Sequence, residues 1–124
     1  MADKNNQIII YNTEDGQAKL EVKLENDTVW LSQKQMAELF DCTPENVIIH
    51  LQNVYNCGVL SEDATTKESL VVQKEGNRTV NRPVKIFNLD AIIYVGYRVN
   101  SLRGTQFRIW ATQKLKDYIV KGFV

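Results

Sequence analysis

The chain has 124 residues, 44% of them apolar, and its 15 lysine and arginine residues balance its 15 aspartate and glutamate residues. This size predicts a single domain over residues 1–124 with a hydrophobic core, and the chain has no apolar run of about 18 residues that would span a bilayer. The polar start, Met1 to Asn6, does not resemble a secretory signal. We therefore expect a cytoplasmic protein in which Cys42 and Cys57 are free thiols.

The net charge of zero hides an uneven distribution. Residues 1–72 carry 5 basic and 12 acidic side chains, a net charge of −7, whereas residues 73–124 carry 10 basic and 3 acidic side chains, a net charge of +7. Such a split indicates a protein in which one part faces an anion, although two halves that neutralise each other on folding would also show it.

Two segments near the start predict an N-terminal β-hairpin. Gln7 to Tyr11 is a short apolar run, and the residues that follow it at 12–16 are rich in turn formers. From Ala18 onwards, apolar and charged residues alternate strictly, as in a strand with one buried face. Residues 29–31 can add a further short strand.

A first helix is predicted over residues 33–40. Ser32 and Gln35 have the spacing of a capping box, in which each side chain accepts a hydrogen bond from the other's backbone N–H. Met36 and Leu39 give this helix an apolar face.

A second, longer helix is predicted over residues 44–56. Thr43 can cap it, Pro44 suits its first position, and Gly58 suits its C-terminal end. A short helix, a turn of about three residues and a longer helix make up the helix-turn-helix arrangement, although many helical hairpins share this pattern.

A second β-hairpin is predicted over residues 66–87, where a wing would follow a helix-turn-helix. Apolar residues at 70–72 and 84–87 flank a polar tip at 74–78. Pro83 cannot donate a hydrogen bond to a neighbouring strand, so we expect it at an edge position or a bulge.

Two C-terminal helices complete the predicted fold. Asn88 can cap a helix over residues 89–99 that is apolar enough to be mostly buried. Residues 100–104 are expected to interrupt the helical structure, and a last helix should run from about Thr105 to Lys121. The predicted fold class is α+β: a helix-turn-helix with a β-hairpin wing, an N-terminal β-hairpin and two C-terminal helices.

The sequence offers no pattern of a catalytic or metal site. His50 is the only histidine, and with Cys42 and Cys57 it lacks the paired spacing of a zinc site. It has no nucleophile motif around it, and no glycine pattern for phosphate or dinucleotide binding occurs. We therefore expect a protein that is not an enzyme and binds no metal, cofactor or small-molecule substrate.

The second predicted helix carries a polar stripe opposite its apolar face. Asn46, Ile49, His50 and Asn53 have the spacing i, i+3, i+4, i+7 and so share one side of the helix. Asparagine can read adenine through two hydrogen bonds, isoleucine can contact a thymine methyl, and histidine can donate or accept. We interpret the stripe as a base-reading surface, and the alternative is a solvated helix face.

Contacts to DNA phosphates must come largely from other segments, because residues 32–57 hold one lysine against three acidic side chains. Cations can come from the second hairpin and the C-terminal helices, and uncharged contacts from the first two helices. The candidate cations are Lys74, Arg78, Arg82, Lys85, Arg98, Arg103 and Arg108, and the uncharged candidates are Ser32, Gln33, Gln35 and Thr43.

Several strings resemble the RhuM family, and the resemblance extends over essentially the whole chain. They lie at residues 8–11, 13–16, 29–40, 87–90, 95–99 and 101–112, and the last, from Ser101 to Thr112, is the most specific. RhuM proteins are usually longer, so we expect a piece of a longer protein. The resemblance implies a bacterial protein associated with virulence and mobile elements.

A second resemblance points to a mechanism. Phe107-Arg108-Ile109-Trp110, followed by Lys121 and Gly122, is similar to the closing helix of BRO-N and KilA-N domains, which are DNA-binding modules of phage antirepressors and viral proteins. This resemblance implies DNA binding and carries over no catalytic residue.

Together these patterns predict the DNA-binding domain of a RhuM-like protein that regulates a mobile element or virulence. Its expected partner is double-stranded DNA, not a membrane, and a homodimer would suit paired half-sites. The alternative is a protein-interaction or oligomerisation module whose C-terminal helices present an apolar patch.

Overall fold

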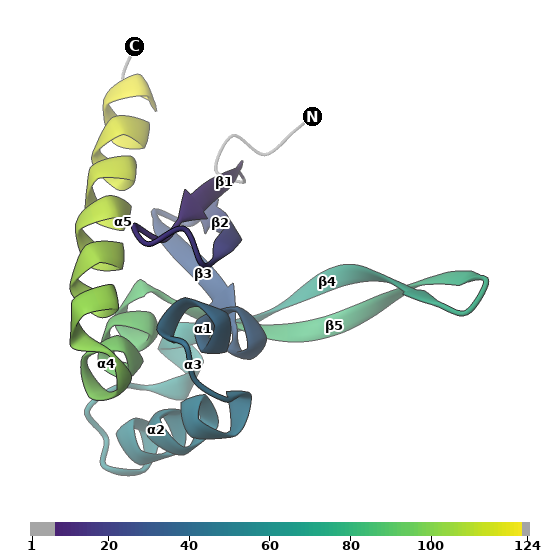
Figure 1. Cartoon of the computed structure of the whole chain (residues 1–124), viewed down its shortest axis with the longest axis horizontal. Helices are drawn as coiled ribbons and strands as arrows, with labels where there is room; N and C mark the ends of the chain where they lie inside the picture. The colour runs from purple at the N-terminus through teal and green to yellow at the C-terminus, as the bar shows by residue number, and fades with distance from the viewer. Residues whose placement is uncertain (1–6, 123–124) are drawn as a thin grey trace.

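A five-stranded antiparallel sheet and five helices make up residues 7–122, the part of the chain that the computed structural model describes (Figure 1). The side chains of residue 73 and residues 119–122 lie outside this description. The sheet has the order β1-β2-β3-β5-β4, and the predicted α+β class is confirmed. The elements are β1 (Gln7–Asn12), β2 (Lys19–Glu25), β3 (Thr28–Ser32), α1 (Gln33–Phe40), α2 (Pro44–Asn56), α3 (Glu62–Thr65), β4 (Thr66–Glu75), β5 (Arg78–Asn88), α4 (Leu89–Val99) and α5 (Ser101–Gly122).

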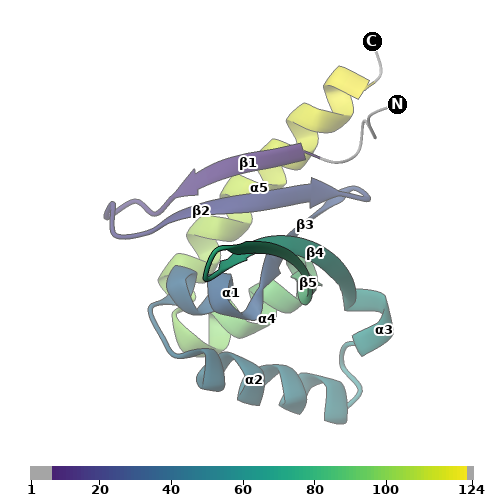
Figure 2. The same ribbon diagram turned by 90° about the vertical axis from the view of Figure 1, so that its right-hand side faces the viewer.

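The predicted N-terminal hairpin is formed by β1 and β2, and β3 extends it. Leu20, Val22 and Leu24 of β2 are buried, while the charged residues between them are exposed or half-buried. On the buried face, Tyr11 meets Phe107 of α5 edge to face, with ring centroids 5.2 Å apart. The long helix α5 therefore covers this face of the hairpin, as Figure 2 shows.

The first two helices begin and end where the sequence predicts. Ser32 Oγ accepts a hydrogen bond from Gln35 N at 3.2 Å, and Gln35 Oε1 accepts one from Ser32 N at 2.9 Å, so the predicted capping box is present. Asp41 ends α1 in a left-handed conformation with φ of 56°. Thr43 then caps α2 by accepting a hydrogen bond from Asn46 N at 3.1 Å.

The predicted interruption is present, but its extent over residues 100–104 is wrong, because only Asn100 leaves the helical conformation. α5 begins at Ser101 and not at Thr105. The Asn100 side chain accepts a hydrogen bond from Arg103 N at 3.2 Å, so a single residue both ends α4 and caps α5.

Gly104 suggested the interruption, yet it lies within α5 at the place where this helix crosses α4. A Cβ atom on Gly104 would lie 3.0 Å from the carbonyl carbon of Gly96. Glycine at these two positions allows the helix backbones to approach each other closely, and it causes no bend here.

The short helix α3 was not predicted. Ser61 caps it by accepting a hydrogen bond from Ala64 N, and Thr65 at its end is buried and shares a hydrogen bond of 2.8 Å with the Tyr55 hydroxyl. This contact joins the end of α2 to the start of β4. A Ser cap before two acidic residues was the only signal in the sequence.

Both cysteine thiols are free, with Cys42 half-buried and Cys57 exposed. Burial raises the pKa of the Cys42 thiol. None of the described helices combines the length and apolar content needed to cross a membrane. Within residues 7–122, no three His, Cys, Asp or Glu side chains lie together as metal ligands would.

Candidate nucleic-acid interface

The stripe of Asn46, Ile49, His50 and Asn53 lies on the outward side of α2. Ile49 is 52% exposed and Asn53 is also exposed, while Asn46 and His50 are half-buried. The opposite side of α2 is buried against α1 and α4 through Val47, Leu51 and Val54. We call the four outward residues the outer stripe, and none of them is packed away in the core.

Hydrogen bonds from α1 fix the direction in which α2 leaves the turn. Gln33 Nε2 donates to the carbonyl oxygen of Pro44 at 2.7 Å, which joins the first residues of the two helices. Gln35 Nε2 donates to the Glu21 carbonyl at 2.7 Å, which joins α1 to β2. Together with the Thr43 cap, these contacts hold the outer stripe in place. Gln33, Gln35 and Thr43 thus have structural roles, and their predicted phosphate contacts stay predictions.

The second hairpin projects from the body of the molecule as a two-stranded arm (Figure 1). β5 pairs with β3 only through Ile86, Phe87 and Asn88, so beyond these residues it has β4 alone as a neighbour. We call residues 68–85 the arm. Pro83 faces Leu70 of β4 here and its other side meets no strand, as predicted for an edge position.

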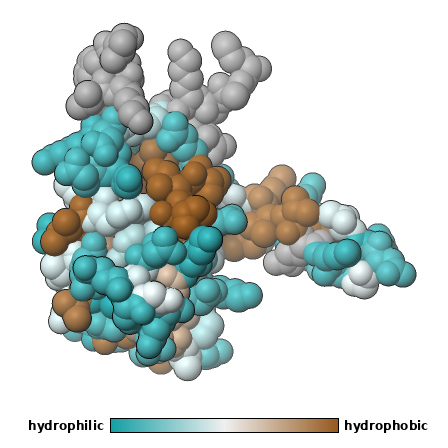
Figure 3. All heavy atoms as spheres, turned by 45° about the horizontal axis from the view of Figure 1, so that its top comes forward, coloured by the Kyte–Doolittle hydropathy of each residue, from teal (hydrophilic) through white to brown (hydrophobic). Residues whose placement is uncertain are grey.

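Of the four predicted cations of the arm, two form ion pairs with glutamates and two do not. Arg82 Nη2 lies 2.6 Å from Glu75 Oε1, and Lys85 Nζ lies 2.8 Å from Glu62 Oε2. These carboxylates raise the pKa of Arg82 and of Lys85. In contrast, Lys74 and Arg78 are exposed and form no ion pair within the described residues. Figure 3 shows hydrophilic side chains at the tip of the arm and apolar ones nearer its base.

The expectation that Arg103 contacts phosphate is wrong, because its side chain is committed to the core. Arg103 is 8% exposed, its Nη1 donates to the Leu39 carbonyl at 2.9 Å, and its Nη2 lies 2.5 Å from Asp15 Oδ2. This arginine satisfies a carbonyl near the end of α1 and links α5 to the β1–β2 turn. The sequence did not distinguish it from the surface arginines.

Arg98 is exposed and Arg108 is half-buried, and each contacts a tyrosine side chain. Arg98 lies 5.0 Å from the ring centre of Tyr94, and Arg108 Nε donates to the Tyr97 hydroxyl at 2.9 Å. We call these two arginines the α4–α5 patch, and both helices lie away from the arm (Figure 1).

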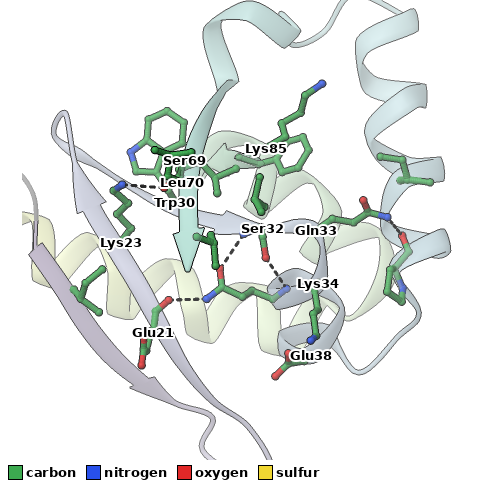
Figure 4. A pocket seen from close by; sticks show the side chains of 18 residues that line it. Glu21, Lys23, Trp30, Ser32, Gln33, Lys34, Glu38, Ser69, Leu70 and Lys85 are labelled. Carbon is green, nitrogen blue, oxygen red and sulfur yellow. Dashed lines mark hydrogen bonds between the residues drawn. The ribbon is translucent and has the colours of Figure 1, made fainter. Parts of the chain in front are cut away.

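A cavity of about 1010 Å³, which no sequence pattern indicated, lies between the arm, β2 and α1 (Figure 4). Lys23 Nζ donates to Ser69 Oγ across it at 3.2 Å, and Trp30 forms part of its wall. Lys67 pairs with Glu25 and lies 4.7 Å from the Trp30 ring centre, which anchors the base of the arm. This hydrogen-bonded Glu25 carboxylate has a lowered pKa. The cavity is assembled from segments far apart in the sequence, so no local motif could reveal it.

Residues 64–124 match the family model described as Virulence protein RhuM family. The match covers about half of the chain and includes the strings at 87–90, 95–99 and 101–112 on which the RhuM resemblance depended, so that resemblance is confirmed here. No curated protein and no solved structure gives a significant match. The likeness to BRO-N and KilA-N domains remains a resemblance in sequence.

Proposed function

We propose that this chain, whose residues 64–124 match the RhuM family model, is a domain of that family which binds double-stranded DNA in a sequence-specific manner. The observation that carries the proposal is the outer stripe of α2, on which two side chains are exposed and two half-buried, while Val47, Leu51 and Val54 on the opposite side are buried. We further propose that it acts as a regulator linked to virulence or a mobile element.

In this proposal α1, the turn at residues 41–43 and α2 act as a helix-turn-helix, with α2 in the major groove. Asn46 and Asn53 lie two turns apart on one side of α2, so both can reach base edges of one groove segment. Ile49 between them would contact a thymine methyl.

The arm acts as the wing and supplies positive charge that the two helices lack. Glu38, Asp41 and Glu45 make the helical part acidic, so phosphate binding needs cations from elsewhere. Lys74 and Arg78 at the end of the arm have no acidic partner in the described part of the chain, and they can therefore neutralise phosphates at full charge.

The experiment is a titration of the protein against mixed genomic duplexes at several salt concentrations. When a protein neutralises phosphates, the logarithm of its affinity for DNA falls linearly with the logarithm of the salt concentration. The slope is about −0.9 per phosphate contact. We expect a slope between about −2 and −5, since the arm and the α4–α5 patch offer only a few free cations. Affinity that is absent, or that hardly changes with salt, would contradict the proposal and favour a protein-interaction module.

A further inference from the structure

One edge and one face of the arm have no partner among the described residues. β4 pairs only with β5, so the backbone groups on its other side are free. Every residue on one face of the arm is exposed, and Leu70 and Val72 on that face are 70% and 67% exposed. A ribbon of two strands is marginally stable by itself, and an apolar edge strand can pair with another chain.

We propose that β4 pairs antiparallel with β4 of a second copy of this chain, about a two-fold axis that places Val71 opposite Val71 of the partner subunit. The two arms then form one four-stranded ribbon. The interface is self-complementary, as a two-fold dimer requires.

The backbone restricts which registers are possible. In an antiparallel pair, the groups that face a free edge belong to every second residue of the strand. In a two-fold pairing, each residue must therefore face a residue of the partner subunit whose number differs from its own by an even number. One residue at the centre then lies opposite its own copy. Near the middle of β4, the choices are Leu70, Val71 and Val72.

Charge and hydropathy select one of these three registers. With Val71 at the centre, Leu70 faces Val72 of the partner subunit and Glu68 faces Lys74 of the partner subunit, each contact occurring twice. With Leu70 at the centre, Glu68 would face Val72, and with Val72 at the centre, Leu70 would face Lys74. Opposite charges and apolar pairs across strands stabilise a sheet, whereas the other registers set a charge against an apolar side chain.

The charges in this register are available for pairing. The side chains of Glu68 and Lys74 are exposed and form no ion pair within the described part of the chain. The next positions outward, Lys67 and Glu75, also oppose each other with opposite charge, although each already has an ion-pair partner in its own chain. Since β4 matches its own copy in both hydropathy and charge, the partner that pairs with its free edge is a second copy of the chain.

The dimer occupies Lys74, one of the two free cations of the arm, and leaves the other residues of the proposed DNA-binding surface free. It uses the outer edge of β4, while Arg78 and Arg82 lie on β5 and the outer stripe lies on α2. The inference therefore does not depend on the proposed function, and its test contains no DNA.

The experiment measures self-association of the full chain by sedimentation at low salt, with charge-reversal variants. Glu68→Lys leaves only positive charge at the two pairing positions, and Lys74→Glu leaves only negative charge. We expect the wild-type chain to form a dimer and each variant to dimerise about tenfold more weakly, because two attractive pairs become repulsive. Glu14→Lys, in the exposed β1–β2 turn, is the matched control and should dimerise like the wild type.

Mixing the two variants gives the decisive result. The mixed pair sets opposite charges against each other at both positions, so an equimolar mixture should recover wild-type association, and a chain carrying both substitutions should recover it too. This recovery separates lost pairing from lost folding. A monomeric wild-type chain, a dimer insensitive to both reversals, or a mixture that fails to recover would each overturn the proposal.

Discussion

Gly96 and Gly104 bring the backbones of α4 and α5 into contact where the two helices cross. A Cβ atom on Gly96 would lie 2.9 Å from the Gly104 Cα atom and 2.8 Å from Cζ of Phe40 in α1. Because α4 also packs against α2, the position of the outer stripe depends on this crossing.

Gly96→Ala should destabilise the protein despite the better helix propensity of alanine. Alanine in place of glycine gains about 1 kcal/mol in a helix interior, whereas forcing a methyl group into a packed core costs about 1–3 kcal/mol. The contacts at Gly96 include backbone atoms that cannot rotate away, so we expect a net loss of about 1–2 kcal/mol in the free energy of unfolding. Thr112→Ala on the exposed side of α5 is the control and should change stability little, as denaturant unfolding would show. An equally stable Gly96→Ala variant would contradict the close crossing.

The Arg103–Asp15 ion pair should make stability depend on pH at the acidic end. The hydrogen bond from Arg103 holds the pKa of the Asp15 carboxyl at about 2, below its ordinary value of 3.8. Because the pKa is lower in the folded state, the pair contributes fully above about pH 4, and the contribution is lost as the pH falls towards 2.

Asp15→Asn should therefore lower the free energy of unfolding at pH 7 and have a much smaller effect near pH 2. The measurement is chemical unfolding at both pH values. Asp27→Asn is the control, because Asp27 lies in an exposed turn without an ion pair in the described residues. An Asp15→Asn effect of the same size at pH 7 and pH 2 would show that the ion pair does not form.

Local patterns predicted most of the fold, and they failed where distant residues decide the outcome. The cap residues Ser32 and Thr43 placed α1 and α2 correctly because a helix start depends on neighbouring side chains. Gly104 was misread as a helix breaker, because glycine is needed there for close packing against the backbone of α4, which the local sequence does not show. Arg103 was assigned to the surface because its partners Leu39 and Asp15 are remote in sequence.

The candidate site follows the same rule. The spacing of the outer stripe was sufficient to place it on one side of α2, and its exposure agrees. Glutamates offset the positive charges of Arg82 and Lys85. The ion pair of Lys85 could not be predicted, since Glu62 comes from α3, a helix that the sequence did not predict.

Within the arm, Arg78 should contribute more to DNA affinity than Lys85. Arg78 has no acidic partner in the described part of the chain, whereas Glu62 offsets the charge of Lys85. Arg78→Gln should weaken binding and reduce the slope of log affinity against log salt by about 0.9, as one phosphate contact is lost. Glu62→Gln, which frees Lys85, should instead strengthen binding. Unchanged affinity and slope for Arg78→Gln would remove the arm from the interface.

Selection of bound duplexes from a random library shows whether the outer stripe reads DNA bases. The comparison is between the wild-type chain, a variant with Asn46, His50 and Asn53 changed to Ala, and the control Gln52→Ala, which alters an exposed residue of α2 outside the stripe. We predict that the wild type and the control enrich the same sequence, and that the triple variant keeps salt-dependent binding but loses at least about tenfold in preference for that sequence. If the triple variant enriches the same sequence as strongly as the wild type, the outer stripe does not read DNA.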